Sequence, residues 1–335
     1  MRKLAIEKTE TLVLTKRKER SPTQAAFRQL MKNKVAVGSG IFLILLIFVT
    51  LFVDNSLIAL VTKQEIKPLI APYHFAKTSF IENNAPPGGK FLLGADYLGR
   101  DLLSRTLYGA RVSLSIAFVA SSVSLVIGII YGLISGYFGG LIDNIMMRIV
   151  DYLYGIPFTV FVILMQVVFK AFARRGQATG LMGVLLKANS SMGGMLFLFI
   201  AIGLLNWVGM ARIARGQVLS YKEKEFVEAA RAVGSSDTRI IFRHLLPNIL
   251  GPCIVRETLM IPTYIFYEAF LSFIGLGVNP PTPSWGIMIS ESVQGLRSYP
   301  FQTFVPGIAL TITTLAFNFL GDGLRDAFDP RLRGE

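Results

Sequence analysis

Charged residues are scarce in this chain. They make up 16% of its 335 residues, whereas hydrophobic residues make up 52%. Soluble domains usually carry about a quarter charged residues, and a polar surface this small could not cover a water-soluble body. The scarcity of charge therefore excludes an ordinary soluble protein and indicates that much of the surface faces a lipid bilayer.

Residues for disulfides, metal binding and nucleotide hydrolysis are also few. The single cysteine, Cys253, excludes an intrachain disulfide, and we interpret it as a small buried apolar residue. His74 and His244 lie far apart in the chain, with no cysteine or carboxylate at metal-ligand spacing, so we expect no metal site. The phosphate-binding pattern GxxxxGK[ST] is absent, because Gly89-Lys90 is followed by Phe91. Any ATP hydrolysis must therefore come from another protein.

The formal net charge of +13 could indicate a nucleic-acid partner. However, the basic residues gather in the N-terminal leader and in loops between long apolar runs. This placement is typical of a membrane protein held against anionic lipid headgroups. We therefore expect membrane lipid, and no nucleic acid, among the partners.

Six apolar segments are long enough to cross a bilayer, which takes about 20 residues in a helix. They predict an all-α membrane protein with transmembrane helices at 35–53, 112–135, 145–169, 192–213, 249–274 and 301–320. Lys and Arg are concentrated in parts of the chain that an even number of spans places on one side, which puts both termini in the cytoplasm. Four basic residues fall on the other side and do not follow this rule: Lys170, Arg174, Arg175 and Lys187.

The same pattern predicts how the chain is divided. In order, the predicted parts are a cytoplasmic basic leader with an interfacial helix (1–34), a first transmembrane helix (35–53), an extracytoplasmic region (54–111), a five-helix unit (112–320) with a cytoplasmic loop (214–247), and a cytoplasmic tail (321–335). The leader helix is expected to begin at Ser21-Pro22, a cap followed by proline at the first helical position. The extracytoplasmic region is expected to be irregular, with a short helix near 101–107.

The loop between the fourth and fifth predicted helices indicates two short helices with a break. The first helix carries an apolar stripe at helical spacing: Phe226, Ala229, Ala230 and Val233. Gly234 suits the left-handed residue that ends a helix, residues 235–237 suit the cap of the next helix, and Pro247 is expected to stop that helix. Such a helix pair can dock into a groove of a partner. An amphipathic loop that rests on lipid headgroups is an equal alternative on periodicity alone.

This loop resembles the EAA loop of binding-protein-dependent ABC importer permeases, in residue type, spacing and position between spans. The resemblance implies a type I ABC importer permease fold in which the loop is a cytoplasmic coupling helix, seated in a cleft of an ATPase subunit. It implies that Glu228 makes polar contacts with the ATPase while Ala229 and Ala230 pack in the cleft. The expected coupling residues are Glu228, Ala229, Ala230, Arg231, Gly234, His244 and Pro247.

Further segments resemble the C-type subunit of the oligopeptide, dipeptide and nickel branch of this family. They are 93–101 (LGADYLGRD), 136–140 (GYFGG), 273–277 (FIGLG), 280–286 (PPTPSWG) and 318–333. Ala95 stands where the family usually has threonine, and 170–191 is longer and more basic than the family pattern. The resemblance extends over roughly 24–333.

The resemblance implies a non-catalytic subunit in the bacterial cytoplasmic membrane that forms half of a translocation path for peptides. The implied partners are a homologous second permease, one or two cytoplasmic ATPase subunits and an extracytoplasmic substrate-binding protein. No cofactor is expected in this chain, because ATP and magnesium would bind to the ATPases. Nickel or another small solute remains an alternative cargo within the family.

A charged side chain within a span raises the free energy of membrane insertion, so each one is expected to have a partner or a function. Glu257 and Glu268 lie eleven residues apart, about three helical turns, so they share a face with Tyr264. This face is expected to line the substrate path or, equally, to contact the partner subunit. Arg148 and Asp151 are expected to form a structural pair.

The loop 280–286 is expected to be a rigid turn with Trp285 as a membrane-interface anchor, or else a contact for a binding protein. Two other classes of protein fit the sequence less well. A secondary transporter would need no docking helix, so the EAA-like loop argues against it. A membrane enzyme is not expected, because no Ser/His/Asp order or HExxH pattern is present.

Overall fold

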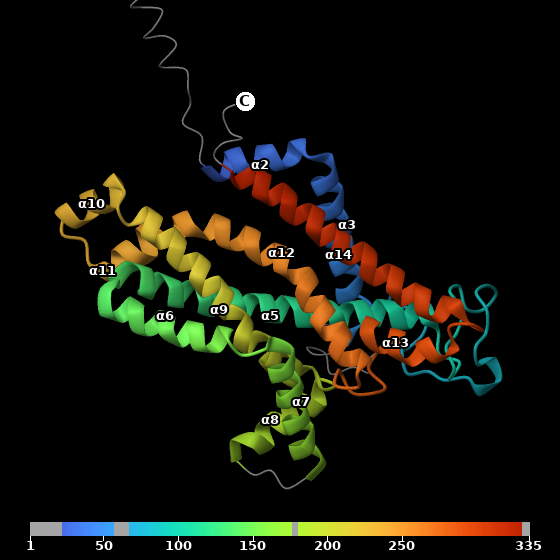
Figure 1. The fold of residues 1–335 in the computed structure, drawn as a ribbon. Helices are drawn as coiled ribbons and strands as arrows, with labels where there is room; N and C mark the ends of the chain where they lie inside the picture. Colours follow the sequence, from blue (N-terminus) through green and yellow to red (C-terminus); the bar gives the residue numbers. More distant parts are fainter. Residues whose placement is uncertain (1–21, 57–66, 176–179, 330–335) are drawn as a thin grey trace, which may run out of the picture.

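The computed structural model describes residues 22–56, 67–175 and 180–329, and within these ranges the protein is helical with irregular connections. Among the described residues, five helices are long and apolar enough to cross a membrane, and a bent pair makes a sixth candidate span. The five are α3 (Lys34–Leu51), α5 (Leu102–Phe138), α9 (Met195–Tyr221), α12 (Leu246–Phe273) and α14 (Pro300–Phe328) (Figure 1). The prediction of an all-α membrane protein with six spans is confirmed.

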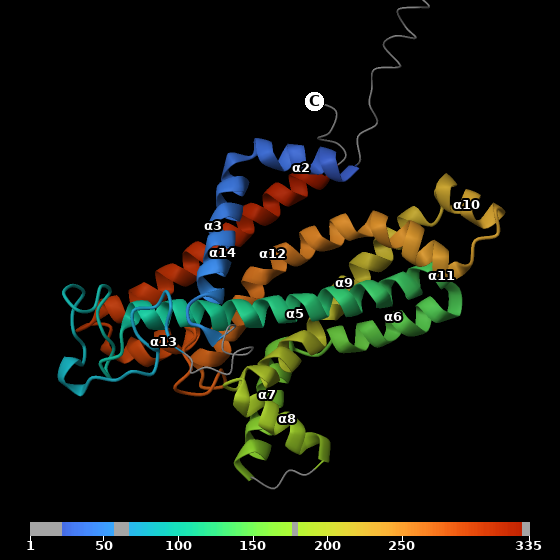
Figure 2. The same cartoon turned by 180° about the vertical axis from the view of Figure 1, so that it is seen from behind.

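The third predicted span, 145–169, is not one straight helix. It consists of α6 (Gly140–Tyr154) and α7 (Phe158–Arg175), which are bent by 77° at the break between them. Pro157 lies in this break, and a proline both lacks the N–H that would continue the helix and disfavours a helical residue before it. The break turns α7 away from the bundle, whereas α6 runs back along α5 after the turn at Gly139 (Figure 2).

Several predicted boundaries were too short. The short helix expected near 101–107 and the second span are one helix, α5, which Asp101 caps through a 2.8 Å hydrogen bond from the Ser104 N–H. α9 continues past residue 213 to Tyr221, and α14 continues past residue 320 to Phe328, so the predicted tail begins as helix. The rest of that tail, 330–335, lies outside the described residues.

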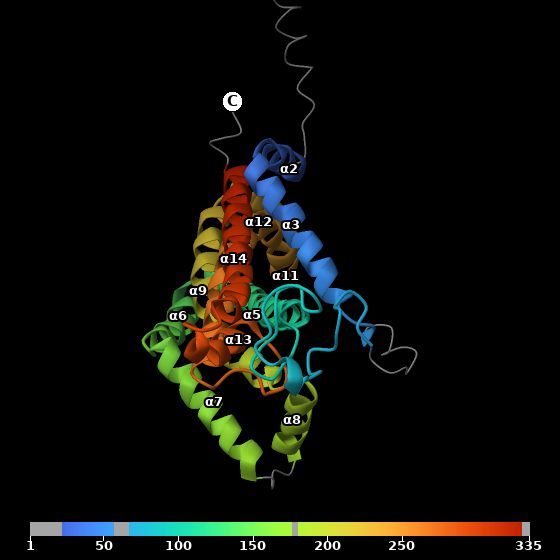
Figure 3. The ribbon, with the colours of Figure 1, turned by 90° about the vertical axis from the view of Figure 1, so that its right-hand side faces the viewer.

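The leader helix α2 (Pro22–Lys32) begins at the predicted proline, although Ser21 lies outside the described residues. It does not run straight into the first span. Asn33 breaks the chain and caps α3, because its side-chain oxygen accepts a hydrogen bond from the Ala36 N–H at 3.1 Å. α2 then lies across the end of α14, and both ends of the described chain meet there (Figure 3).

The tightest helix contact in the bundle joins α5 and α9. Gly128, Gly132 and Gly136 lie one turn apart on the face of α5 that meets α9. A Cβ at Gly132 would lie 2.6 Å from the carbonyl oxygen of Ala211. Small residues at such spacing let two helix backbones approach closely, which is a main source of helix association in lipid.

The loop before the last span is anchored inside the protein. Trp285 begins α13 (Trp285–Ser292), is 1% exposed, and donates its indole N–H to the Thr106 carbonyl at 3.1 Å. The expectation that Trp285 is a membrane-interface anchor is therefore wrong. A buried tryptophan needs an acceptor for its N–H, and the carbonyl of α5 provides it.

Candidate functional site

The EAA-like segment forms a short helix that projects from one end of the bundle. α10 (Glu225–Ala232) is followed by Gly234 with φ +79°, the left-handed conformation predicted for this glycine. The chain then turns into α11 (Asp237–Arg239), which leads directly into the fifth span (Figure 1). α10 therefore lies between α9 and α12 in the chain, at one end of both helices.

One side of α10 holds it to the bundle, and the other side is exposed. Val227 is fully buried and Ala230 packs against the same core cluster. Glu228, Ala229, Arg231 and Gly234 are exposed. Phe226 of α10 is 38% exposed, and Val233, which caps the C-terminal end of α10, is 86% exposed. Most of the apolar stripe read from the sequence therefore faces away from the subunit, as a docking surface would.

The loop is tied to α5 through Tyr137, a residue that the sequence analysis did not single out. The Tyr137 hydroxyl donates a 2.6 Å hydrogen bond to Asp237, and the Arg231 guanidinium lies 5.6 Å from the centre of the tyrosine ring. Asp237 was expected only as a helix cap. Because Tyr137 contacts both helices of the loop, it fixes the position of the loop relative to α5.

Pro247 does not stop the second helix of the loop, which corrects the prediction. The helix continues from Asp237 to Phe273 as one candidate span, with Pro247 inside it. The turn before the proline, Ile240–Leu245, is a π-helix. A proline cannot donate to the carbonyl one turn before it, and a π turn is a common way to accommodate such a local mismatch. His244 lies in this turn and is half-buried.

A cluster of charged groups joins α5, α6 and α9 close to the loop. Asp143 accepts hydrogen bonds from Ser135 and from the Arg215 Nε, the latter at 2.6 Å. Asp151 pairs with Arg212 of α9 at 2.7 Å, and not with Arg148 as expected from the spacing. The sequence shows that these charges need partners, but the turn at Gly139, which places α6 beside α5 and α9, decides which partners they meet.

The two carboxylates of the fifth span lie inside the subunit and face α5. Glu257 is 3% exposed and accepts a 2.7 Å hydrogen bond from the hydroxyl of Tyr264. Glu268 is 0% exposed and accepts hydrogen bonds from Ser113 at 2.8 Å and Ser272 at 2.6 Å. The shared face is therefore present, and it is used for packing between α12 and α5 within one subunit.

At the opposite end of the bundle, the segment 93–101 closes the start of α5. Asp96 binds Arg100 at 2.6 Å, and Arg100 and Arg105 both reach Glu291 of α13, at 3.0 and 2.9 Å. Nearby, burial raises the pKa of Asp54, but hydrogen bonds from Ser56 and the charge of Arg111 outweigh it and leave that pKa lowered. The ion pairs of Asp96 and Arg100 give the segment 93–101 a structural role.

Two known family patterns match the sequence of this chain. The pattern of the family "Binding-protein-dependent transport system inner membrane component" matches residues 128–334, which include the whole loop with α10. The chain belongs to this family. Residues 21–87 match a second pattern, the "N-terminal TM domain of oligopeptide transport permease C". The protein is therefore an ABC transporter permease with several membrane-spanning helices.

Named members of the family are similar to this permease over nearly all of its length. The dipeptide transport system permease protein DppC of Bacillus subtilis is 40% identical over 98% of this chain and 91% of its own. The oligopeptide transport system permease protein OppC of Escherichia coli K12 is 38% identical over 94% of this chain and 93% of its own. Among solved structures, the inward-facing MetNI methionine ABC transporter aligns with 65% of this chain and 94% of that chain, at 22% identity and a TM-score of 0.47.

Removal of the Glu268 side chain from this permease is expected to destabilise the fold rather than alter transport. Glu268→Ala deletes both acceptors for Ser113 and Ser272 and leaves a cavity, which should cost about 2–4 kcal/mol. Thermal unfolding of the purified protein measures this loss. Transport per folded complex should keep its KM, whereas a changed KM would support the original prediction that Glu257, Tyr264 and Glu268 line the substrate path.

Gly99 gives a second stability prediction for the permease. It has φ +69°, and a Cβ there would lie 1.9 Å from the Ser79 carbonyl oxygen, so Gly99→Ala is expected to cost about 2 kcal/mol or more. Gly89, with φ +55° and no atom within 4 Å of its added Cβ, is the matched control. Gly89→Ala should cost about 1 kcal/mol, from the backbone alone. Equal thermal unfolding of the two variants would contradict the close contact.

Proposed function

We propose that this chain is a permease subunit of an ATP-driven ABC importer and forms half of the translocation path for dipeptides or oligopeptides. The observation that carries this proposal is the near full-length similarity to relatives named as dipeptide and oligopeptide permeases. The same names favour peptides over nickel as the cargo. A binding protein delivers the peptide to the outer face, since the family is named for this dependence.

The structure suggests how ATP hydrolysis elsewhere could move this subunit. ATP and magnesium bind to separate cytoplasmic ATPase subunits, and this chain supplies no catalytic group. The exposed face of α10, with Glu228, Ala229 and the apolar Phe226, docks in a cleft of an ATPase. Because α10 connects directly to α9 and α12 and contacts α5 through Tyr137, a displacement of the docked helix tilts three spans together.

The orientation follows from the same assignment. α10 lies in the cytoplasm, and with six spans both termini lie there too, so the described outer segments face the other side of the bacterial cytoplasmic membrane. Exposed apolar residues on α6, such as Ile145 and Ile149, are then available to lipid or to a homologous second permease. A heterodimer of two permeases completes the path.

Purification of the tagged chain from its native membrane, followed by mass spectrometry, tests this proposal. A second permease and one or two ATPase subunits are expected to co-purify with it. A chain that is recovered alone under mild extraction would contradict the ABC assignment and would favour a stand-alone secondary transporter.

A further inference from the structure

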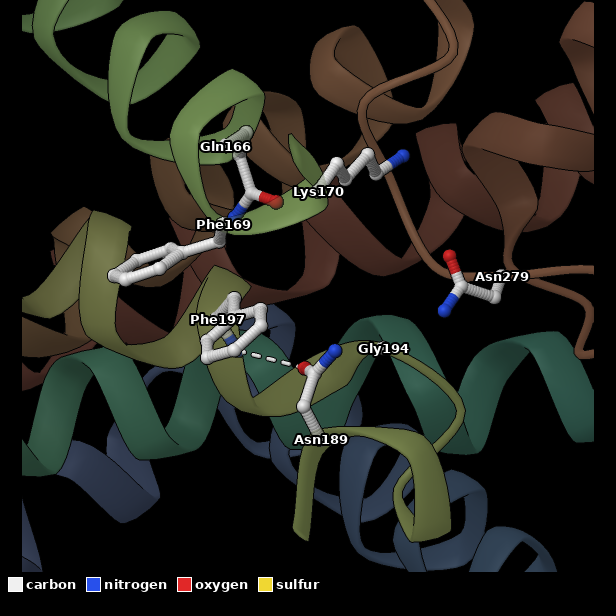
Figure 4. Close-up of a pocket in the computed structure, with 7 residues that line it drawn as sticks. All are labelled: Gln166, Phe169, Lys170, Asn189, Gly194, Phe197 and Asn279. Atoms are coloured by element: carbon white, nitrogen blue, oxygen red, sulfur yellow. Dashed lines mark hydrogen bonds between the residues drawn. The ribbon is translucent and has the colours of Figure 1, made fainter. Parts of the chain in front are cut away.

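A cavity of about 300 Å³ with polar and aromatic walls lies where α7, α8 (Gly180–Ser191), the start of α9 and the loop before α13 meet (Figure 4). This volume lies at the lower end of the range for small-ligand sites. In the orientation proposed above, the cavity is on the outer side of the membrane. It is built partly from 170–191, the segment that departs from the family pattern.

One wall of the cavity holds a buried hydrogen-bond donor that lacks an acceptor. Gln166 of α7 is 1% exposed, and its Nε2 has no partner among the described residues. A buried amide without a partner costs free energy comparable to a lost hydrogen bond. An oxygen of a ligand bound in the cavity would give this donor its acceptor.

Two further amides and one cation face the same space. Asn189 is 7% exposed and uses its Oδ1 to accept the Phe197 N–H at 3.1 Å, which leaves its NH2 group directed into the cavity (Figure 4). Asn279 reaches in from the opposite side. Lys170 lies beside them and donates to the Gly275 carbonyl at 2.8 Å. Among the described residues, the cavity lining therefore has donors and one positive charge but no carboxylate.

The remaining wall is aromatic. The rings of Phe169 and Phe197 stack with their centres 4.2 Å apart, and both residues line the cavity. A site of this kind pairs an oxygen-rich anionic group with an adjacent apolar group. A peptide has both at its C-terminus, where a carboxylate adjoins the last side chain, whatever its sequence.

We propose that this cavity binds the C-terminal carboxylate of a short peptide, with Gln166, Asn189 and Asn279 as donors. This inference rests on the proposed function in peptide import. An outer site of this kind would hold the end of a peptide released by the binding protein before the path opens. Because it contacts the carboxylate, it selects for a free C-terminus and not for particular side chains.

Peptide binding to the assembled complex in lipid nanodiscs tests the proposal. The probes are Ala-Ala-Phe with a free carboxylate and the same tripeptide with a C-terminal amide, titrated by calorimetry. We expect the amide to bind about tenfold more weakly or worse, since it loses charge-assisted hydrogen bonds. Gln166→Leu and Asn279→Leu are each expected to weaken binding of the free acid by about tenfold.

Gln166→Leu also separates a binding role from a structural one. The variant removes a buried unpaired amide, so without peptide its thermal stability should be unchanged or higher. Leu164, an exposed residue of the same helix, gives the control Leu164→Ala, which should bind both probes as the wild type does. Equal binding of the two probes, wild-type binding by Gln166→Leu, or competition by anionic lipid instead of peptide would each overturn the proposal. If the complex still imports peptide although one of these results is found, the proposed function stands and only the proposal for the cavity fails.

Discussion

Replacement of Phe226 and Val233 by aspartate is expected to abolish capture of ATPase subunits while the permease stays folded. Both side chains are apolar, and they are 38% and 86% exposed, on α10 and at its C-terminal cap respectively. A few buried anchor residues carry most of the binding energy of a docking interface, and we expect a charge at two of them to weaken binding by more than about a hundredfold. The measurement is the amount of ATPase that co-purifies with the tagged double variant.

Two controls separate docking from folding. Thr238→Asp introduces the same charge at an exposed residue of α11, outside the apolar stripe, and should leave capture unchanged. Val227→Asp places the charge in the buried anchor of α10 and should lower thermal stability as well as capture. If the Phe226 and Val233 double variant retains normal ATPase levels, α10 rests on lipid headgroups and is not a coupling helix.

Gly132→Leu is expected to cause the largest loss of stability. The added Cβ would lie 2.6 Å from the Ala211 carbonyl oxygen and 2.6 Å from the Ala214 Cβ, so α5 and α9 would have to separate. Overpacking of this kind typically costs about 1–3 kcal/mol, and we expect about 3 kcal/mol or more here because backbone atoms cannot move aside. Thermal unfolding in detergent and yield of intact complex measure the effect.

Gly216→Leu is the matched control, because Gly216 is an exposed glycine of α9 with no atom within 4 Å of its added Cβ. Leucine favours a helix more than glycine does, so this variant should be neutral or up to about 1 kcal/mol more stable. If both leucine variants behave alike, the close approach of α5 and α9 is not what stabilises the bundle.

Apolar length and loop charge were sufficient to predict six spans, because both follow from the bilayer and act locally. The bend at Pro157 was not predicted, since a proline can either kink a span or divide it, depending on the neighbouring helices. Similarly, the helix continues past Pro247, because the preceding π turn, Ile240–Leu245, is held by the packing of its buried side chains. Local rules for proline give a preference, and tertiary contacts decide the outcome.

For the candidate site, the sequence indicated the exposed stripe of α10 and the left-handed Gly234, because helical spacing and glycine conformation are local properties. It did not indicate Tyr137, whose partner Asp237 is one hundred residues away. The spacing of Gly128, Gly132 and Gly136 is a signal that could have been read, although not the identity of the facing helix. The partner of Asp151 was mispredicted for the same reason, because Arg212 lies 61 residues away on another helix.

ATP-driven uptake of a radiolabelled tripeptide tests the central claim most directly. The complex is reconstituted in vesicles with its binding protein and ATPases, so that peptide outside enters only when ATP is hydrolysed inside. The account predicts uptake that requires both ATP and the binding protein and is lost in the Phe226 and Val233 aspartate variant. Uptake that proceeds without ATP, driven by an ion gradient, would contradict it.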